Sequence, residues 1–184
     1  MTWRWPDAPR RVVVTGMGAL TALGQDVGST WDGLLAGRSG VATIGAFDPS
    51  RLDCRIAAEV HDFDPTGVLD RKDIRRTDRY IQFGLVAARQ ALDHAGLPGR
   101  LDAALAERTG VILGSGLGGV HTLFDNVLVM AERGPDRISP FFIPMGIANV
   151  GAGQIAIASG ALGPNFAAVS ALGLLAYRPQ GPRA

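Results

Sequence analysis

Three continuous apolar runs stand out in the hydrophobic pattern of the chain, and none shows the alternation of a half-exposed strand. The first is β-branched and ends at Gly16, and the second runs into a glycine-rich stretch that begins at Gly114. Continuous runs of this kind are typical of strands buried on both faces of an α/β sheet. We therefore predict strands over residues 11–15, 109–113 and 165–171, and a fourth strand over residues 55–60 in a loop-rich stretch.

Helical periodicity is clearest over residues 77–95, where apolar or small side chains recur at three- and four-residue spacing until Gly96. Gly84 and Ala88 lie on this stripe, so we expect another element to approach the helix closely there. A shorter helix is predicted from the candidate N-cap Ser29 to a stop at Gly37. Further helices are predicted over residues 120–131 and 144–159. Strands that alternate with helices indicate a layered α/β sheet.

Composition and charge narrow the class of protein. The 184 residues are 47% hydrophobic and 19% charged, which is a globular composition sufficient for one ordinary domain or half of a larger one. A net charge of +1 argues against a general nucleic-acid binder. A single Cys excludes a disulfide framework and favours a reducing compartment. The first residues lack the pattern of a signal peptide, so we expect a cytoplasmic protein.

Residues 138–177 contain no charged side chain, which raises the question of a membrane span. Prolines and glycines divide the stretch into pieces too short and too polar to cross a bilayer; among them are Pro140, Pro144, Gly151 and Gly160. We expect this segment to be buried inside a soluble fold and to make no membrane contact.

A glycine fingerprint, Gly114-x-Gly116-x-x-Gly119, follows a predicted strand and precedes a helix, as in dinucleotide-binding proteins. The pattern is weak on its own, because it lies far from the start of the chain and Glu132 does not end a second strand. Cys54 has no neighbouring group that would lower its pKa, and the three histidines, His61, His94 and His121, lack the spacing of metal ligands. We therefore propose no nucleotide, metal or other cofactor.

The densest basic cluster consists of Arg71, Lys72, Arg75 and Arg76, just before the long helix. One interpretation is a solvated helix start that nearby aspartates partly neutralise. The other is a surface for an acidic partner, since cations near a helix N-terminus oppose the macrodipole and need another reason to be there. Hereafter we call these four residues the basic cluster.

Five motifs in the same order resemble the N-terminal half of the β-ketoacyl-acyl-carrier-protein synthases of type II, which are thiolase-fold condensing enzymes. The motifs occupy residues 12–18, 30–40, 112–119, 138–144 and 163–165. The resemblance covers roughly residues 11–171. It implies an α/β, thiolase-like fold of which only the N-terminal half is present, layered α-β-α with a mixed sheet.

The same resemblance implies decarboxylative Claisen condensation of an acyl thioester with malonyl-acyl carrier protein in fatty acid biosynthesis, or in a related polyketide pathway. The family uses a Cys nucleophile at a strand-to-helix turn, and His and Lys residues from its later half. In this chain Leu172 occupies the expected Cys position, and an aliphatic side chain cannot form a thioester. No catalytic residue is therefore assigned, and we expect the chain to be inactive.

Two explanations of Leu172 remain open. The tail from this residue, rich in Arg, Pro and Gly, could be an out-of-frame translation, which we favour because residues 166–171 still follow the family pattern. Alternatively, the chain is a non-catalytic paralogue that binds a carrier protein or a full-length synthase. Either way the expected organisation is an N-terminal segment 1–10, an incomplete synthase domain 11–171 and a divergent tail 172–184.

The resemblance also assigns binding residues. Leu117 would line the acyl pocket, and Phe142 would lie near it or near the pocket of a partner subunit. The basic cluster falls where the family has basic residues suited to the acidic acyl carrier protein. A homodimer is implied for the full-length family, so we expect half of the fold to expose apolar surface and to aggregate.

Overall fold

We describe residues 11–170 of a computed structural model of the chain. The order of elements along the chain is α1 (Val27–Leu35), β1 (Val41–Thr43), β2 (Ile56–Ala58), α2 (Arg71–Ile74), α3 (Arg79–His94), α4 (Ala103–Ala106), β3 (Val111–Ser115), α5 (Val120–Arg133), the 3-10 helix η1 (Pro135–Arg137), α6 (Phe142–Gly146), α7 (Ala148–Ser159) and β4 (Asn165–Val169). The predicted strands near 55–60 and 109–113 and the predicted helices 77–95 and 120–131 are confirmed. The strand predicted over 165–171 is observed as β4, Asn165–Val169, and residue 171 lies outside the described residues.

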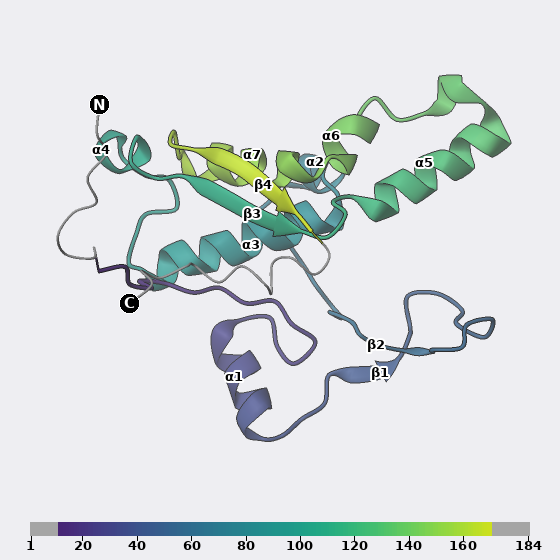
Figure 1. The fold of residues 1–184 in the computed structure, drawn as a ribbon, viewed down its shortest axis with the longest axis horizontal. Helices are drawn as coiled ribbons and strands as arrows, with labels where there is room; N and C mark the ends of the chain where they lie inside the picture. Colours follow the sequence, from purple (N-terminus) through teal and green to yellow (C-terminus); the bar gives the residue numbers. More distant parts are fainter. Residues whose placement is uncertain (1–10, 171–184) are drawn as a thin grey trace, which may run out of the picture.

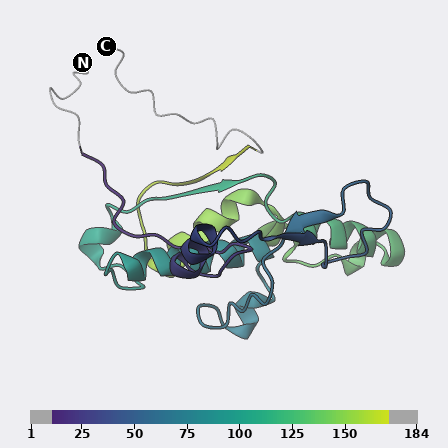
Figure 2. The same cartoon turned by 90° about the horizontal axis from the view of Figure 1, so that it is seen from below.

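The sheets combine parallel and antiparallel pairing in two separate places. Strands β3 and β4 are parallel, with Val111 opposite Asn165, whereas β1 and β2 are antiparallel, with Val41 opposite Ala58. Helices α7 and α3 lie against one face of the β3–β4 pair (Figures 1 and 2). The parallel strands require a crossover connection, which α5, α6 and α7 supply.

The core lies between α3, α7 and the inner face of β3. Ile81 and Leu85 of α3 are buried with Leu69 and Ile155, and Leu113 packs against this group. The close approach predicted at Gly84 is confirmed, because a Cβ there would lie 3.2 Å from Cδ1 of Ile155. The small side chains of the stripe therefore let α7 pack directly on α3.

The predicted strand over residues 11–15 is wrong. The segment has no regular secondary structure, and Val12 and Val14 are 92% and 80% exposed. Side chains of α3 bind the backbone just after it, since Gln90 Oε1 accepts a hydrogen bond from the amide of Ala19 at 2.9 Å. In the described part of the chain no strand pairs with the valines, so their β propensity alone does not place them in a sheet.

The sequence also misplaced two helix boundaries. Asp26, not Ser29, is the N-cap of α1; its carboxylate accepts from the amide of Ser29, which takes the third helical position of a capping box. The single helix predicted over 144–159 is two helices, α6 and α7, because Ile147 adopts an extended conformation between them.

The expectation that the uncharged segment is buried holds only in part. Ile143, Ile157 and Phe166 are all at least half exposed, and Ile112, which pairs with Phe166, is 67% exposed on the outer face of the sheet. Figure 2 shows this outer face without a covering helix among the described residues. None of the described helices is both long enough and apolar enough to cross a bilayer.

Candidate functional site

The basic cluster forms the corner between α2 and α3. Arg71 and Lys72 belong to α2, whereas Arg75 and Arg76 lie in the short connection before α3. All four side chains are exposed, and within residues 11–170 none forms an ion pair with a carboxylate. The cluster is therefore a patch of positive charge that faces solvent.

The aspartates around the basic cluster act as helix caps. Asp70 accepts from the amides of Lys72 and Asp73 at 2.8 and 2.7 Å and so begins α2. Asp78 caps α3 by accepting from the amide of Tyr80 at 3.2 Å. Asp70 and Asp78 thus use their oxygens as helix caps, and neither forms an ion pair with a cation of the basic cluster.

Side-chain hydrogen bonds fix the angle of this corner. Nε2 of Gln82 donates to the carbonyls of Ile74 and Thr77, both at 3.0 Å, and the Thr77 hydroxyl donates to the carbonyl of Asp73 at 2.7 Å. The carbonyl of Asp73 also accepts from the amide of Arg76 at 3.0 Å, so backbone and side-chain bonds together satisfy the end of α2. The backbone that carries the cluster is thus held in one conformation against α3.

The glycine-rich turn, residues 114–119, connects β3 to α5 and carries Leu117, which is 75% exposed. Gly118 has a φ of 79°, in the left-handed region that suits glycine. Its amide donates to Oγ of Ser115 at 2.9 Å. A side chain at Gly119 would collide with the carbonyl of Met145, so this position needs a glycine for close approach to α6.

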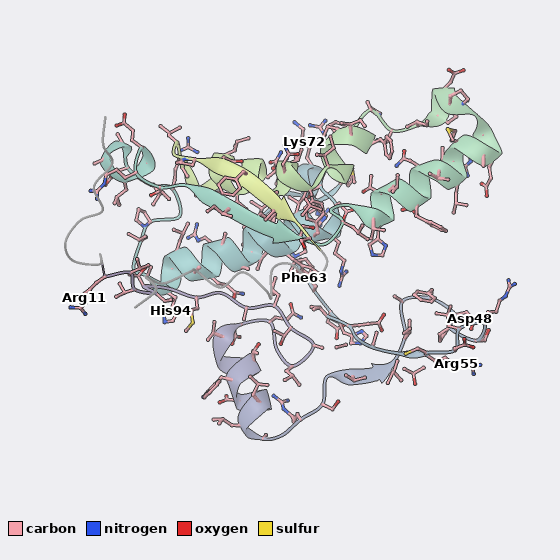
Figure 3. The ribbon with its side chains drawn as sticks, in the orientation of Figure 1. Arg11, Asp48, Arg55, Phe63, Lys72 and His94 are labelled. Carbon is pink, nitrogen blue, oxygen red and sulfur yellow. The ribbon has the colours of Figure 1, made fainter. Side chains whose placement is uncertain are left out.

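Helix α6 brings Phe142 to the same end of the sheet. The amide of Gly119 donates to the carbonyl of Gly146 at 3.0 Å, which attaches the end of α6 to the glycine-rich turn. At the other end of α6, the ring of Phe141 lies 4.8 Å below the guanidinium of Arg76 in a cation–π contact. Figure 3 labels Lys72 on α2 beside α6, and His94 at the far end of α3.

The structure therefore brings together three features that are far apart in sequence: the basic cluster, the glycine-rich turn with Leu117, and the segment with Phe141 and Phe142. All three lie where β3 ends. The amide of Ser170, directly after β4, donates to the carbonyl of Ser115 at 3.2 Å, so β4 ends at the same place. Leu172 lies outside the described residues.

Sequence reasoning missed the residue that joins these features. Asp78 is 4% exposed, and its Oδ2 accepts from both the amide and the hydroxyl of Thr122 on α5, at 3.1 and 2.6 Å. The amide near the start of α5 is thus occupied by a carboxylate of the chain itself. In a dinucleotide site that helix terminus would face a phosphate.

Of the remaining candidate residues, Cys54, His61 and His94 lie away from this end of the sheet, whereas His121 is the second residue of α5 and is exposed. Cys54 is exposed in the loop before β2, and its thiol donates to the carbonyl of Ile56 at 3.8 Å. His94 accepts from the amide of Met17, and His61 lies 3.9 Å from Glu59. No cluster of three metal-ligating side chains occurs among residues 11–170.

Two pKa shifts have clear physical causes. Burial against α7 raises the pKa of Tyr80, whose hydroxyl donates to the carbonyl of Ile147 at 2.7 Å. Hydrogen bonds from the backbone amides of Gly45 and Ala46 lower the pKa of Glu59. Both groups hold backbone segments in place and lie outside the three features described above.

Comparison with known proteins identifies the family. The family described as β-ketoacyl synthase, N-terminal domain, matches residues 9–172. The chain belongs to the β-ketoacyl synthase family. It is 46% identical over 162 residues to 3-oxoacyl-[acyl-carrier-protein] synthase 2 of Coxiella burnetii, and 44% identical to the enzyme of that name from Synechocystis sp.. These matches cover 88% of this chain and 39% and 38% of the relatives. The chain therefore spans about two fifths of the length of the curated relatives it matches.

Solved β-ketoacyl synthase structures share the fold. The ishigamide ketosynthase/chain length factor superposes with a TM-score of 0.77 at 30% identity, over 88% of this chain and 40% of that one. A β-ketoacyl synthase from Burkholderia phymatum gives a TM-score of 0.69 at 26% identity, over 84% and 38%. The α/β, thiolase-like architecture with only the N-terminal half of the fold is thereby confirmed.

Proposed function

We propose that the chain is the carrier-recognising part of a 3-oxoacyl-[acyl-carrier-protein] synthase and does not itself condense acyl groups. The parent activity would be decarboxylative Claisen condensation with malonyl-acyl carrier protein, in fatty acid or polyketide synthesis. The observation that carries the proposal is the exposed basic cluster, held beside the glycine-rich turn and α6. Acyl carrier protein, which the relatives' names specify, is the acidic partner that such a patch suits.

Each proposed residue has a role that follows from its place. The basic cluster would attract the acidic carrier protein, since none of its four side chains is paired with a carboxylate among residues 11–170. Leu117 and Phe142, on the two segments that meet at Gly119, would line the pocket for the acyl chain. Apolar side chains suit that task because an alkyl chain gains about 0.8 kcal/mol per buried methylene.

The absence of condensation follows from the residue at position 172. A condensing enzyme needs a thiolate to accept the acyl group, and Leu172 has no nucleophilic atom. The exposed Cys54 is remote from the three features and is not a substitute. We expect purified chain, given acyl- and malonyl-carrier protein, to yield no β-ketoacyl product by mass spectrometry of the carrier. Condensation above the rate without protein would overturn this part of the proposal.

A second candidate is a binding paralogue that associates with a full-length synthase. The exposed outer face of the β3–β4 pair, with Ile112 and Phe166, favours it, since open apolar sheet faces are typical of interaction surfaces. This candidate predicts co-elution with a full-length synthase of the family in gel filtration. The carrier-recognising candidate predicts co-elution with acyl carrier protein alone, so one experiment with both partners separates the two.

A further inference from the structure

The start of helix α5 is stabilised by a residue of another helix. Gly119, at the N-cap position of α5, has no side chain, and α5 has no side-chain cap of its own. The amide that a local cap would satisfy, that of Thr122, instead donates to Oδ2 of Asp78, 44 positions earlier in the chain. A carboxylate at this place also compensates the positive end of the helix dipole.

Asp78 serves both helices with different oxygen atoms. Oδ1 caps α3 through the amide of Tyr80, while Oδ2 receives the amide and the hydroxyl of Thr122. A Cβ at Gly119 would lie 3.0 Å from Oδ2, so the glycine-rich turn passes directly over the carboxylate. The position of that turn is therefore tied to Asp78 on one side and to α6 on the other.

The contacts continue from Thr122 back to the basic cluster. One helical turn along α5, Asn126 donates to the carbonyl of Thr122 at 2.8 Å and accepts from the amide of Ser139 at 3.1 Å. The Ser139 hydroxyl accepts from the amide of Phe141, whose ring lies under Arg76. Arg76 is two residues before Asp78, so the contacts form a closed ring.

We propose that Asp78 is a positioning residue that caps α5 across the fold and thereby sets the place of Leu117 and of α6 relative to the basic cluster. The importance of that placement rests on the proposed function, in which Leu117 and Phe142 line the acyl pocket. The capping itself is a property of the chain alone and can be tested without any carrier protein.

The Asp78→Asn variant separates the two roles of the side chain. Asparagine caps a helix as well as aspartate does, so its oxygen keeps the bond to Tyr80. Its NH2 group then faces the amide of Thr122, which loses its acceptor. We expect amide hydrogen exchange at Thr122 to accelerate by about tenfold or more, because losing a hydrogen bond to a charged group changes the equilibrium constant for local opening by more than about tenfold. Exchange at Tyr80 stays within about threefold of wild type.

Asp93→Asn is the matched control, since Asp93 lies in the helix that Asp78 caps, is half exposed and, among residues 11–170, has Arg89 as its ion-pair partner. The proposal is overturned if Asp78→Asn changes exchange at Thr122 no more than this control does, or accelerates Tyr80 equally. Should Asp78→Asn fail to fold, the Thr122→Val and Thr122→Ser variants test the same contact from the α5 side. Serine keeps the hydroxyl bond at 2.6 Å and valine removes it, so only valine should accelerate exchange at Gly119.

Titration of the same samples with acyl carrier protein keeps this inference distinct from the proposed function. If wild-type chain binds no carrier while Thr122 exchange still depends on Asp78, the proposed function fails and the positioning role stands. If carrier binds but exchange at Thr122 is indifferent to Asp78, the positioning role fails and the proposed function stands.

Discussion

Reversing two charges of the basic cluster should weaken binding of acyl carrier protein without unfolding the chain. Arg75 and Arg76 are exposed and pair with no carboxylate among residues 11–170, so Arg75→Glu with Arg76→Glu breaks no ion pair within them; the one described contact it removes is the cation–π contact of Arg76 with Phe141. An exposed ion pair contributes about 0.2–1 kcal/mol, and reversal replaces attraction with repulsion of similar size. For two positions we expect a loss of about 0.8–4 kcal/mol, which is roughly a 4- to 700-fold rise in Kd.

The assay is fluorescence anisotropy of labelled acyl carrier protein at several salt concentrations. Because the Debye length falls from about 10 Å at 0.1 M to about 3 Å at 1 M salt, wild type and variant should converge at high salt. The matched control is Arg51→Glu with Arg108→Glu, two exposed arginines outside the basic cluster that change the net charge equally. Equal weakening by the control pair, or no weakening by Arg75→Glu with Arg76→Glu, would refute the assignment of this surface.

Three further results follow from the packing and charges. Ile81→Ala, at a side chain that is 1% exposed, should lower the free energy of unfolding in urea by about 2–5 kcal/mol, and a loss under 1 kcal/mol would contradict the described core. Since the hydrogen bond from the Gly45 amide lowers the folded pKa of Glu59, the stabilisation it contributes is present above the unfolded pKa of about 4.5 and disappears as pH falls through the folded pKa. Glu59→Gln should therefore lower the free energy of unfolding at pH 7 but not at a pH below the folded pKa of Glu59. Equal effects at the two pH values would refute the hydrogen bond from Gly45 as the cause. Ile112→Lys with Phe166→Lys should reduce light scattering by the chain, whereas unchanged scattering would show that the outer sheet face does not drive association.

Local sequence patterns predicted the elements whose partners lie within the described residues. The repeat over α3 and the run over β3 were read correctly because α7 and β4 supply the surfaces that bury them. The strand predicted for the valines before Gly16 is wrong for the opposite reason. A strand needs a hydrogen-bonded neighbour, and no strand among residues 11–170 pairs with these valines. The break at Ile147 between α6 and α7 was missed because both sides of it are apolar.

The residues of the candidate site remain predictions from charge and family motifs, and their arrangement could not be predicted from the sequence. The basic cluster, Leu117 and Phe142 were found from charge and from family motifs, each without reference to the others. Their meeting depends on Asp78 and Thr122, 44 positions apart in sequence, and no local pattern marks that contact. An aspartate before a helix is read as its N-cap, which is correct for α3 and conceals the second role at α5.

Native mass spectrometry of the chain with acyl-loaded carrier protein tests the central claim most directly, because it reports association and acyl transfer in one spectrum. We expect a complex whose mass is the sum of the two proteins, from which each dissociates with its mass unchanged. Appearance of the acyl group on the chain, with loss of that mass from the carrier, would contradict the claim that the chain recognises the carrier without performing the chemistry. So would the absence of any complex at low salt.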